Sequence, residues 1–253
     1  MTLDFTFLCK DPADFYGPPL PHCFGSSAQG TVTYLQELIL AFKTTTLLTI
    51  SALILAIITG FLVGIIRTLP KNRFLQILAA FWIEFFRNIP LLIIVFLSYF
   101  VVPKIFPKIN DLLRQDPFLG SYIFIAALGF FTSARIAEQV RSGINTIPKN
   151  QIYAAQALGF TTFQIYLYIF IPHTLRTIMP PLTSEAMGIV KNSAIAISVS
   201  VNEMMNFLNQ SVEETARSYE IYIIITFLYA LLAFFVFITM SFIQYIIYKN
   251  YPK

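Results

Sequence analysis

The sequence predicts an all-α integral membrane protein with about five transmembrane helices. Hydrophobic residues make up 57% of the 253 residues and charged residues only 12%, whereas soluble domains carry about a quarter charged residues. A bilayer core of roughly 30 Å is crossed by about 20 apolar residues of helix. Runs of that kind, poor in charge, lie at residues 44–66, 74–102, 121–140, 182–201 and 221–248.

The first and last runs are the clearest of the five. Residues 44–66 contain no charge and are followed by Arg67, and residues 221–248 are likewise uncharged up to Lys249. The three middle runs contain charged residues, namely Glu84, Arg87, Arg135, Glu138, Glu185 and Lys191. Because Pro90 removes a backbone donor from the second run, we expect that helix to kink or break there.

The positions of Lys and Arg predict the orientation, because cytoplasmic loops retain an excess of both. The basic residues of the expected inner segments are Arg67, Lys71, Arg73, Arg141, Lys149, Arg176, Lys249 and Lys253. Residues 1–43 are therefore expected to be extracytoplasmic, residues 44–248 to form the membrane domain with a cytoplasmic loop at about 141–180, and residues 249–253 to be a cytoplasmic tail. The outer segments hold most carboxylates, Glu203 among them, together with three basic residues, Lys104, Lys108 and Arg114.

Two cysteines and two histidines limit the chemistry of the chain. Cys9 and Cys23 are too few for a zinc cluster; they form either a disulfide, if their segment faces an oxidising compartment, or two separate thiols. His22 and His173 are the only histidines, and no Ser/His/Asp or Cys/His constellation is credible. We therefore expect no catalytic residue, no metal and no cofactor.

The sequence lacks the patterns of ATP-binding proteins, nucleic-acid-binding proteins and cleavable signal peptides. The sequence has no Gly-x-x-x-x-Gly-Lys-Ser/Thr phosphate loop, so ATP must bind another chain. The net charge of +4 is scattered and forms no basic stripe, which argues against nucleic-acid binding. Residues 1–30 lack the basic start and apolar core of a cleavable signal peptide.

A loop between the third and fourth runs has the pattern of a helical hairpin. Tyr153-Ala-Ala-Gln-Ala-Leu-Gly159 favours a helix that stops at Gly159, since alanine and leucine are strong helix formers and glycine is not. Thr161 or Thr162 is a suitable N-cap for a second short helix, which Pro172 is expected to end. The small alanines leave a shallow knob that a groove of another protein can grip. Composition alone also fits a hairpin lying on the membrane surface.

This loop resembles the EAA loop of bacterial ABC-importer permeases. The resemblance is carried by the segment from Tyr153 to Gly159 and by Ile171-Pro172, and it departs at Tyr153, where many members have Glu. Three further blocks are similar to polar amino-acid permeases of the histidine and glutamine type, and within them most to glutamate/aspartate permeases. These blocks are residues 84–92, residues 137–148, and residues 180–185 with 191–194.

The resemblance implies a type I ABC-importer permease fold in the bacterial inner membrane, surrounded by lipid. Its implied partners are cassette ATPase subunits, a second permease subunit that is identical or related, and a periplasmic amino-acid-binding protein. The residues implied to dock with the ATPase are Tyr153, Ala154, Ala155, Ala157, Gly159, Ile171 and Pro172. The chain is then no enzyme, and it moves a polar amino acid by alternating access. The preferred cargo is an acidic amino acid, with glutamine or a basic amino acid as the alternatives.

Charges inside the spans are candidates for the substrate path. A charge at the centre of a spanning helix costs roughly 2.5–3.5 kcal/mol on insertion scales, so it usually faces the protein interior and has a partner. The candidates are Arg135, Lys191, Asn192, Ser193, Glu84 and Glu138. The two cations suit the carboxylates of an acidic substrate. The alternative is an ion pair that holds the helices together, with Glu84, Glu138 or Glu185 as the partner.

Two other functions are weighed against import by an ATPase-driven permease. One is an ion-coupled secondary carrier with Glu84 or Glu138 as its proton site, and the other is a structural membrane scaffold. The odd number of spans and the lack of evident internal repeats argue against the inverted repeats of many secondary carriers. The likeness of the hairpin to the EAA loop disfavours both alternatives.

Overall fold

The structure is a computed structural model that describes residues 3–10, 12, 23, 33–70, 72–116 and 118–250, and every regular element in these ranges is a helix. The α-helices are α1 (Tyr34–Thr68), α2 (Arg73–Asn88), α3 (Leu91–Phe96), α4 (Val102–Ile105), α5 (Pro107–Gln115), α6 (Leu119–Asn145), α7 (Lys149–Ala157), α8 (Thr162–Ile165), α9 (Ile171–Asn192), α10 (Met204–Thr215) and α11 (Ser218–Asn250). Two short 3₁₀ helices, Thr6–Cys9 and Ser193–Val199, and two π-helices, Leu97–Val101 and Tyr166–Phe170, complete the fold.

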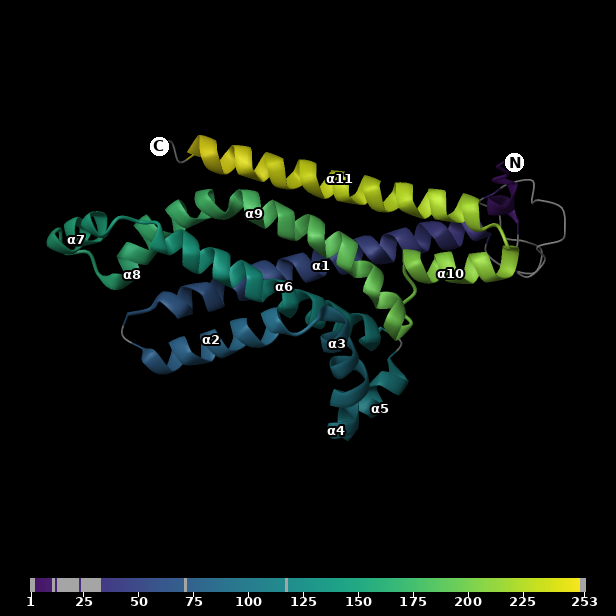
Figure 1. Ribbon diagram of the computed structural model, residues 1–253, viewed down its shortest axis with the longest axis horizontal. Coiled ribbons are helices and arrows are strands. Elements are labelled where there is room, and N and C mark those ends of the chain that lie inside the picture. The colour runs from purple at the N-terminus through teal and green to yellow at the C-terminus, as the bar shows by residue number, and fades with distance from the viewer. Residues whose placement is uncertain are drawn as a thin grey trace.

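Four long helices, α1, α6, α9 and α11, run side by side along the length of the molecule (Figure 1). In the described part of the chain, α1, α6 and α11 are long and apolar enough to cross a membrane. They contain the first, third and last predicted runs. α9 lies beside them but contains Arg176, Glu185 and Lys191 as well as two internal prolines, so its composition is less apolar.

The second predicted run is a bent pair of helices. The axis turns by 108° between Arg73–Asn88 and Leu91–Ile105, and the pair counts as a fourth span only if the two parts are taken together. Pro90 is the N-cap residue of α3 and Ile89 before it is extended, as expected for a residue that precedes proline. The break predicted at Pro90 is confirmed. α3, α4 and α5 lie to the side of the four long helices (Figure 1).

Small residues bring α1 and α6 close together. A Cβ added at Gly60 would lie 2.8 Å from the Ile136 Cβ, and one added at Gly64 would lie 2.7 Å from the Ala137 carbonyl oxygen. Without side chains at these positions the two backbones approach closely, which is how helices associate in lipid, where apolar burial gives little gain. A larger residue at Gly60 would force the pair apart.

The outer faces of the long helices are apolar and exposed. On α1, Leu47, Ile54 and Leu62 are each more than half exposed, and on α11 so are Phe227 and Phe234. Apolar surface of this extent is unfavourable in water but suits contact with lipid tails. The fold therefore fits the predicted all-α membrane protein.

The chain turns a corner after α9. The 3₁₀ helix Ser193–Val199 follows α9 directly, and Ser200 then adopts a left-handed conformation with φ 56°. α10 begins after this corner and lies beside the N-terminal ends of α1 and α11 (Figure 1). The predicted run 182–201 is thus α-helical up to Asn192 and 3₁₀ beyond it.

The N-terminal residues pack against the same end of the molecule. Cys9 and Cys23 form a disulfide, which settles the alternative that the sequence left open. Phe7 is completely buried, with its ring 6.0 Å from that of Tyr34. Arg217 Nη1 lies 2.7 Å from Asp4 Oδ2 and donates to the Asp4 carbonyl oxygen at 2.7 Å. Most of the predicted segment 1–43 before residue 33 lies outside the described residues.

Candidate functional site

The predicted hairpin is formed by α7 and α8, at the end of the molecule where the C-terminus also lies (Figure 1). α7 ends at Ala157, and Gly159, which follows the C-cap residue Leu158, has a left-handed φ of +81°. The amide of Gly159 donates to the Gln156 carbonyl at 2.9 Å and that of Phe160 donates to the Ala155 carbonyl at 3.0 Å. These two bonds form a Schellman motif, which satisfies carbonyls that the helix end would leave open. The predicted stop at Gly159 is confirmed.

The second helix of the hairpin starts as predicted but continues further. Thr161 is its N-cap, and the Thr161 hydroxyl and Gln164 side chain form a capping box. The chain then runs through the π-helix Tyr166–Phe170 into α9. The prediction that Pro172 ends this helix is wrong. Pro172 is in the first turn of α9, directly after the π-helix, and the chain remains helical through it.

The hairpin exposes large apolar side chains away from the long helices. Leu158 is 78% exposed, Phe163 73% and Tyr153 61%. Ala154, Ala157 and Gly159 are exposed as well, and Ile171 and Pro172 are half-buried. Ala155 is buried and seats α7 on the hairpin stem. The hairpin therefore has an apolar tip, in which Tyr153 was among the predicted docking residues and Leu158 and Phe163 were not.

The stem of the hairpin is held by few polar contacts. The Tyr166 hydroxyl donates to Thr68 Oγ1 at 3.0 Å, which links the hairpin to the end of α1. A hollow of about 340 Å³ lies beside this bond, and its lining includes Thr68, Ile144, Ile152 and Tyr166. Burial raises the pKa of the Tyr166 hydroxyl.

Arg135 forms the ion pair that the sequence offered as an alternative. Its Nε lies 3.1 Å from Oε2 of Glu185, and Gln139 Nε2 donates to Oε1 of the same carboxylate at 3.3 Å. The pair joins α6 to α9, the two helices that flank the hairpin. The guanidinium also lies over the Phe131 ring, 4.6 Å from its centre. The positive charge of Arg135 is therefore already engaged within the chain.

Two glutamate candidates have partners on their own helices. Glu138 accepts two hydrogen bonds from Arg141 Nε, at 3.0 and 3.1 Å, and also pairs with Arg141 Nη2. Glu84 is exposed and accepts from Asn88 Nδ2 at 3.0 Å. Neither carboxylate contacts Arg135 or another predicted cation.

Lys191 is placed differently from the other candidates. Its side chain is exposed on α9 and has no ion pair or hydrogen bond within the described ranges. Six positions at about 100° per residue turn it roughly 120° away from Glu185 around the helix. Ser193 beside it is buried and donates to the Val190 carbonyl at 2.8 Å, while Asn192 is half-buried. Arg135 and Lys191 therefore do not converge on one site within a single chain.

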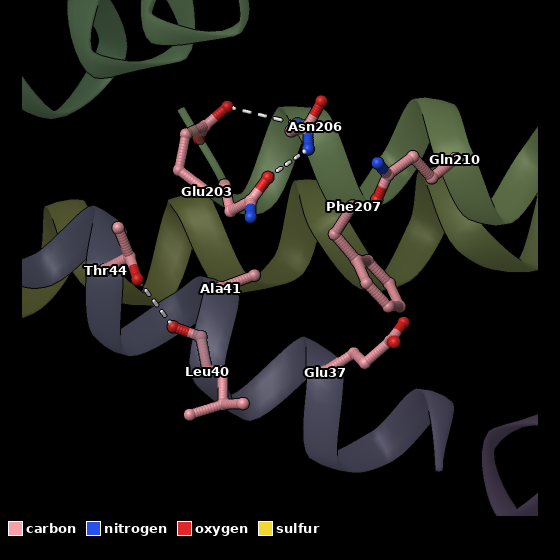
Figure 2. A pocket seen from close by; sticks show the side chains of 9 residues that line it. Glu37, Leu40, Ala41, Thr44, Glu203, Asn206, Phe207 and Gln210 are labelled. Atoms are coloured by element: carbon pink, nitrogen blue, oxygen red, sulfur yellow. Dashed lines mark hydrogen bonds between the residues drawn. The ribbon is translucent and has the colours of Figure 1, made fainter. Parts of the chain in front are cut away.

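Sequence reasoning missed a buried carboxylate. Glu203, counted among the outer acidic residues, has no exposed surface and caps the N-terminus of α10. It borders a hollow of about 300 Å³ between α1 and α10 (Figure 2). No local signal marks this position, because the preferred N-cap residues are Ser, Thr, Asp and Asn, and Glu is not among them.

The geometry defines a class of protein, a multi-span membrane protein with a projecting apolar hairpin at one end. Residues 52–249 match the family described as "Binding-protein-dependent transport system inner membrane component", and the chain belongs to this family. The chain is a multi-pass permease subunit of an inner-membrane transport system. It is not an enzyme, because the ATPase of such a system is a separate chain.

Individual relatives agree with the family. The chain is 37% identical over 219 residues to the glutamate/aspartate import permease protein GltJ of Escherichia coli (strain K12), covering 85% of this chain and 89% of the relative. It is 33% identical over 206 residues to the probable glutamine ABC transporter permease protein GlnM of Bacillus subtilis (strain 168), covering 80% and 91%. A crystal structure of an amino acid ABC transporter with histidines matches with a TM-score of 0.68 and 25% identity, over 83% of this chain and 94% of that one. As a family member, the chain works with an ATPase, a binding protein and a second permease subunit.

Proposed function

We propose that this chain is one permease half of an ABC importer for polar amino acids, with an acidic amino acid as its cargo, and that ATP hydrolysis is coupled to it through the α7–α8 hairpin. The observation that carries the proposal is the apolar tip formed by Leu158 and Phe163, about three quarters exposed, at the end of a capped and otherwise regular hairpin. An exposed apolar tip of this kind is stable when a partner's groove covers it.

The proposed orientation has the N-terminus outside and the C-terminus in the cytoplasm. The hairpin, the C-terminal end of α11 and the α1–α2 connection lie at one end of the molecule, and the N-terminal residues lie at the other (Figure 1). Arg67 and Arg73 flank that connection and Lys249 ends α11, so basic residues gather at the hairpin end. The Cys9–Cys23 disulfide at the opposite end suits an oxidising compartment.

Lys191 is the proposed contact for the cargo in this subunit, with Asn192 beside it. Because Arg135 is paired with Glu185, Lys191 is the predicted cation that is left unpaired in the described part of α6 and α9. An ammonium group within the membrane is tolerated where it faces a polar path or a partner subunit. The carboxylates of glutamate or aspartate, the cargo named for the Escherichia coli relative, would complement it. The second permease subunit, identical or related, would close the path.

The test is uptake of radiolabelled glutamate into proteoliposomes that contain this chain with its partner permease, its ATPase and its binding protein. We expect uptake that requires internal ATP and is competed by aspartate. Leu158→Asp should lower uptake by tenfold or more, because it places a charge where an apolar surface is buried on docking. The matched control is Leu112→Asp on α5, an equally simple change at a half-exposed leucine away from the hairpin.

Each outcome has a definite meaning. Equal uptake without ATP would contradict the proposal and favour a secondary carrier. ATP-driven uptake of a different amino acid, with none of glutamate, would contradict the cargo only. An equal loss in Leu158→Asp and Leu112→Asp would contradict coupling through the hairpin tip.

A further inference from the structure

Glu203 links three helices at the end of the molecule opposite the hairpin. Its Oε1 accepts from the backbone amides of Met205 at 2.8 Å and Asn206 at 3.2 Å. Its Oε2 accepts from the Tyr229 hydroxyl on α11 at 2.8 Å and lies 3.4 Å from Thr45 Oγ1 on α1. Figure 2 shows the carboxylate turned toward Asn206 at the start of α10, across from the side chains of α1.

The carboxylate is held by hydrogen bonds and not by a cation. Among the described residues Glu203 forms no ion pair, although it is fully buried. Burial of a charged group without partners is very unfavourable, so these donors are needed to keep it in place. The positive end of the α10 dipole adds to them. Thr45 Oγ1 also accepts from the Met204 amide at 3.1 Å, which ties α1 to the same helix start.

The corner just before Glu203 separates two hollows. The hollow between α1 and α10, about 300 Å³, and a second hollow of about 380 Å³ share Thr44 and Asn202 in their linings. Ser200, left-handed at φ 56°, lines the second hollow. Asn202 accepts from Asn206 Nδ2 at 2.9 Å, so its side chain also depends on the start of α10. Both hollows have the size of small-ligand sites.

We propose that Glu203 is a positioning residue for transport: its hydrogen bonds fix the Ser200–Asn202 corner, and this corner shapes the outer mouth through which the amino acid passes from the binding protein. The inference rests on the proposed function. Glu203 acts through the corner and does not itself contact the cargo. The role requires its hydrogen bonds and not its charge.

The test compares Glu203→Ala with Glu203→Gln in proteoliposome uptake of glutamate as the concentration of loaded binding protein is varied. Glu203→Ala leaves the amides of Met205 and Asn206 without their acceptor, and the loss of such bonds is expected to raise the apparent KM about tenfold. In Glu203→Gln the side-chain oxygen still accepts from these amides, and the Tyr229 hydroxyl can turn to accept from the amide nitrogen. We expect its KM to stay within about twofold of the parent.

Two further variants keep the test decisive. Tyr229→Phe retains Glu203 but removes the 2.8 Å donor, and we expect a KM increase of severalfold with assembled complex in normal amount. Glu213→Gln is the matched control, because Glu213 is exposed on α10 and its side chain forms no hydrogen bond or ion pair in the described ranges. It should leave KM unchanged.

The outcomes separate this inference from the proposed function. No ATP-dependent uptake of glutamate by the parent protein would refute the proposed cargo or coupling. Parent uptake with Glu203→Gln as impaired as Glu203→Ala would refute positioning by hydrogen bonds and assign the role to the charge. If Glu203→Ala does not assemble, Tyr229→Phe decides, and an unchanged KM in that variant refutes the proposal. A variant that lowers only the maximal rate and leaves KM unchanged also refutes it.

Discussion

The two ends of the helix bundle are built in opposite ways. At the end with the N-terminus, the Asp4–Arg217 ion pair and the Glu203 hydrogen bonds connect different parts of the chain, and the Cys9–Cys23 disulfide closes a short loop. At the other end, the hairpin meets α1 through the Tyr166–Thr68 hydrogen bond beside a hollow, and its apolar tip is exposed. One end is thus cross-linked within the chain, and the other exposes an apolar tip that we propose a partner covers.

This difference indicates which end of the molecule a partner can move. An element with few internal contacts and a large exposed apolar surface can be moved by a partner at low cost, whereas a cross-linked end moves as a unit. The flanking helices α6 and α9 join the two ends, and the Arg135–Glu185 pair holds them together between the ends. Loosening either end separately should therefore give different phenotypes.

The largest expected effect is at the cross-linked end. The disulfide closes a loop with a sequence separation of 14, and a loop of this size contributes about 3 kcal/mol in the chain-entropy account. Cys9→Ser/Cys23→Ser should lower the thermal midpoint of the purified complex by several degrees. Adding a reductant should lower the thermal midpoint of the parent protein to the same value.

The double serine variant is its own control, because the reductant should leave it unchanged. If the reductant lowers the midpoint of the parent and the variant equally, the disulfide is not what stabilises this end.

The second-largest effect is expected for the Arg135–Glu185 ion pair, which lies between the two ends. Arg135→Met leaves Glu185 largely buried without its cation, and we expect a loss of about 1–2 kcal/mol, less than for a fully buried pair because the arginine side chain is 37% exposed. Arg135→Met/Glu185→Gln should restore folded yield and glutamate uptake, both measured per assembled complex. A double variant that folds normally but binds glutamate poorly would show that Arg135 contacts the cargo.

A local effect is expected at the hairpin turn. Gly159 has φ +81°, and an added Cβ meets no atom within 4 Å, so strain of the backbone is the only penalty for a side chain. Gly159→Ala should cost roughly 1–2 kcal/mol, whereas Gly159→Asn tolerates the left-handed conformation better. We expect lower uptake in the alanine variant than in the asparagine variant, and a thermal midpoint that is lower by a few degrees. Equal uptake in both variants would mean that the turn conformation does not matter for coupling.

The smallest effect is a pH dependence at the N-terminus. Hydrogen bonds from Thr6 and Arg217 hold the pKa of Asp4 well below its usual range. A carboxylate with a lowered folded-state pKa stabilises the fold above its ordinary pKa of about 4, and this contribution is lost as the pH falls further. Proteolysis of the N-terminal residues should therefore increase in acid. The Asp4→Asn variant should show no such dependence, and a parallel rise in both proteins would contradict this account.

Sequence reasoning was most successful where the chain's own local chemistry decides the structure. The uncharged runs 44–66 and 221–248 lie inside α1 and α11, and Pro90 breaks the second run as its missing donor requires. Gly159 and Thr161 end and begin helices because their caps are satisfied within a few residues. The comparisons with known proteins support the family to which the blocks of resemblance pointed.

It failed where a distant part of the chain decides. Pro172 was expected to end a helix, but the π-helix Tyr166–Phe170 runs directly into α9, and Pro172 lies in the first turn of α9. Glu203 was placed among the outer carboxylates, since nothing near it in sequence reveals that Tyr229 and Thr45 would cover it. Glu203 is buried because α1, α10 and α11 pack around it. The choice between Glu185 and other partners for Arg135 likewise depended on how α6 meets α9.

The most direct measurement is site-directed cross-linking of the hairpin tip to the ATPase. In the Cys9→Ser/Cys23→Ser background the chain has no other cysteine, so Leu158→Cys and Leu112→Cys can each be tested as a single thiol in the assembled complex with a short bifunctional reagent. We expect a cross-linked permease–ATPase product for Leu158→Cys and none for Leu112→Cys. Full ATP-driven uptake without any product at Leu158, or a product at Leu112 alone, would contradict coupling through the hairpin.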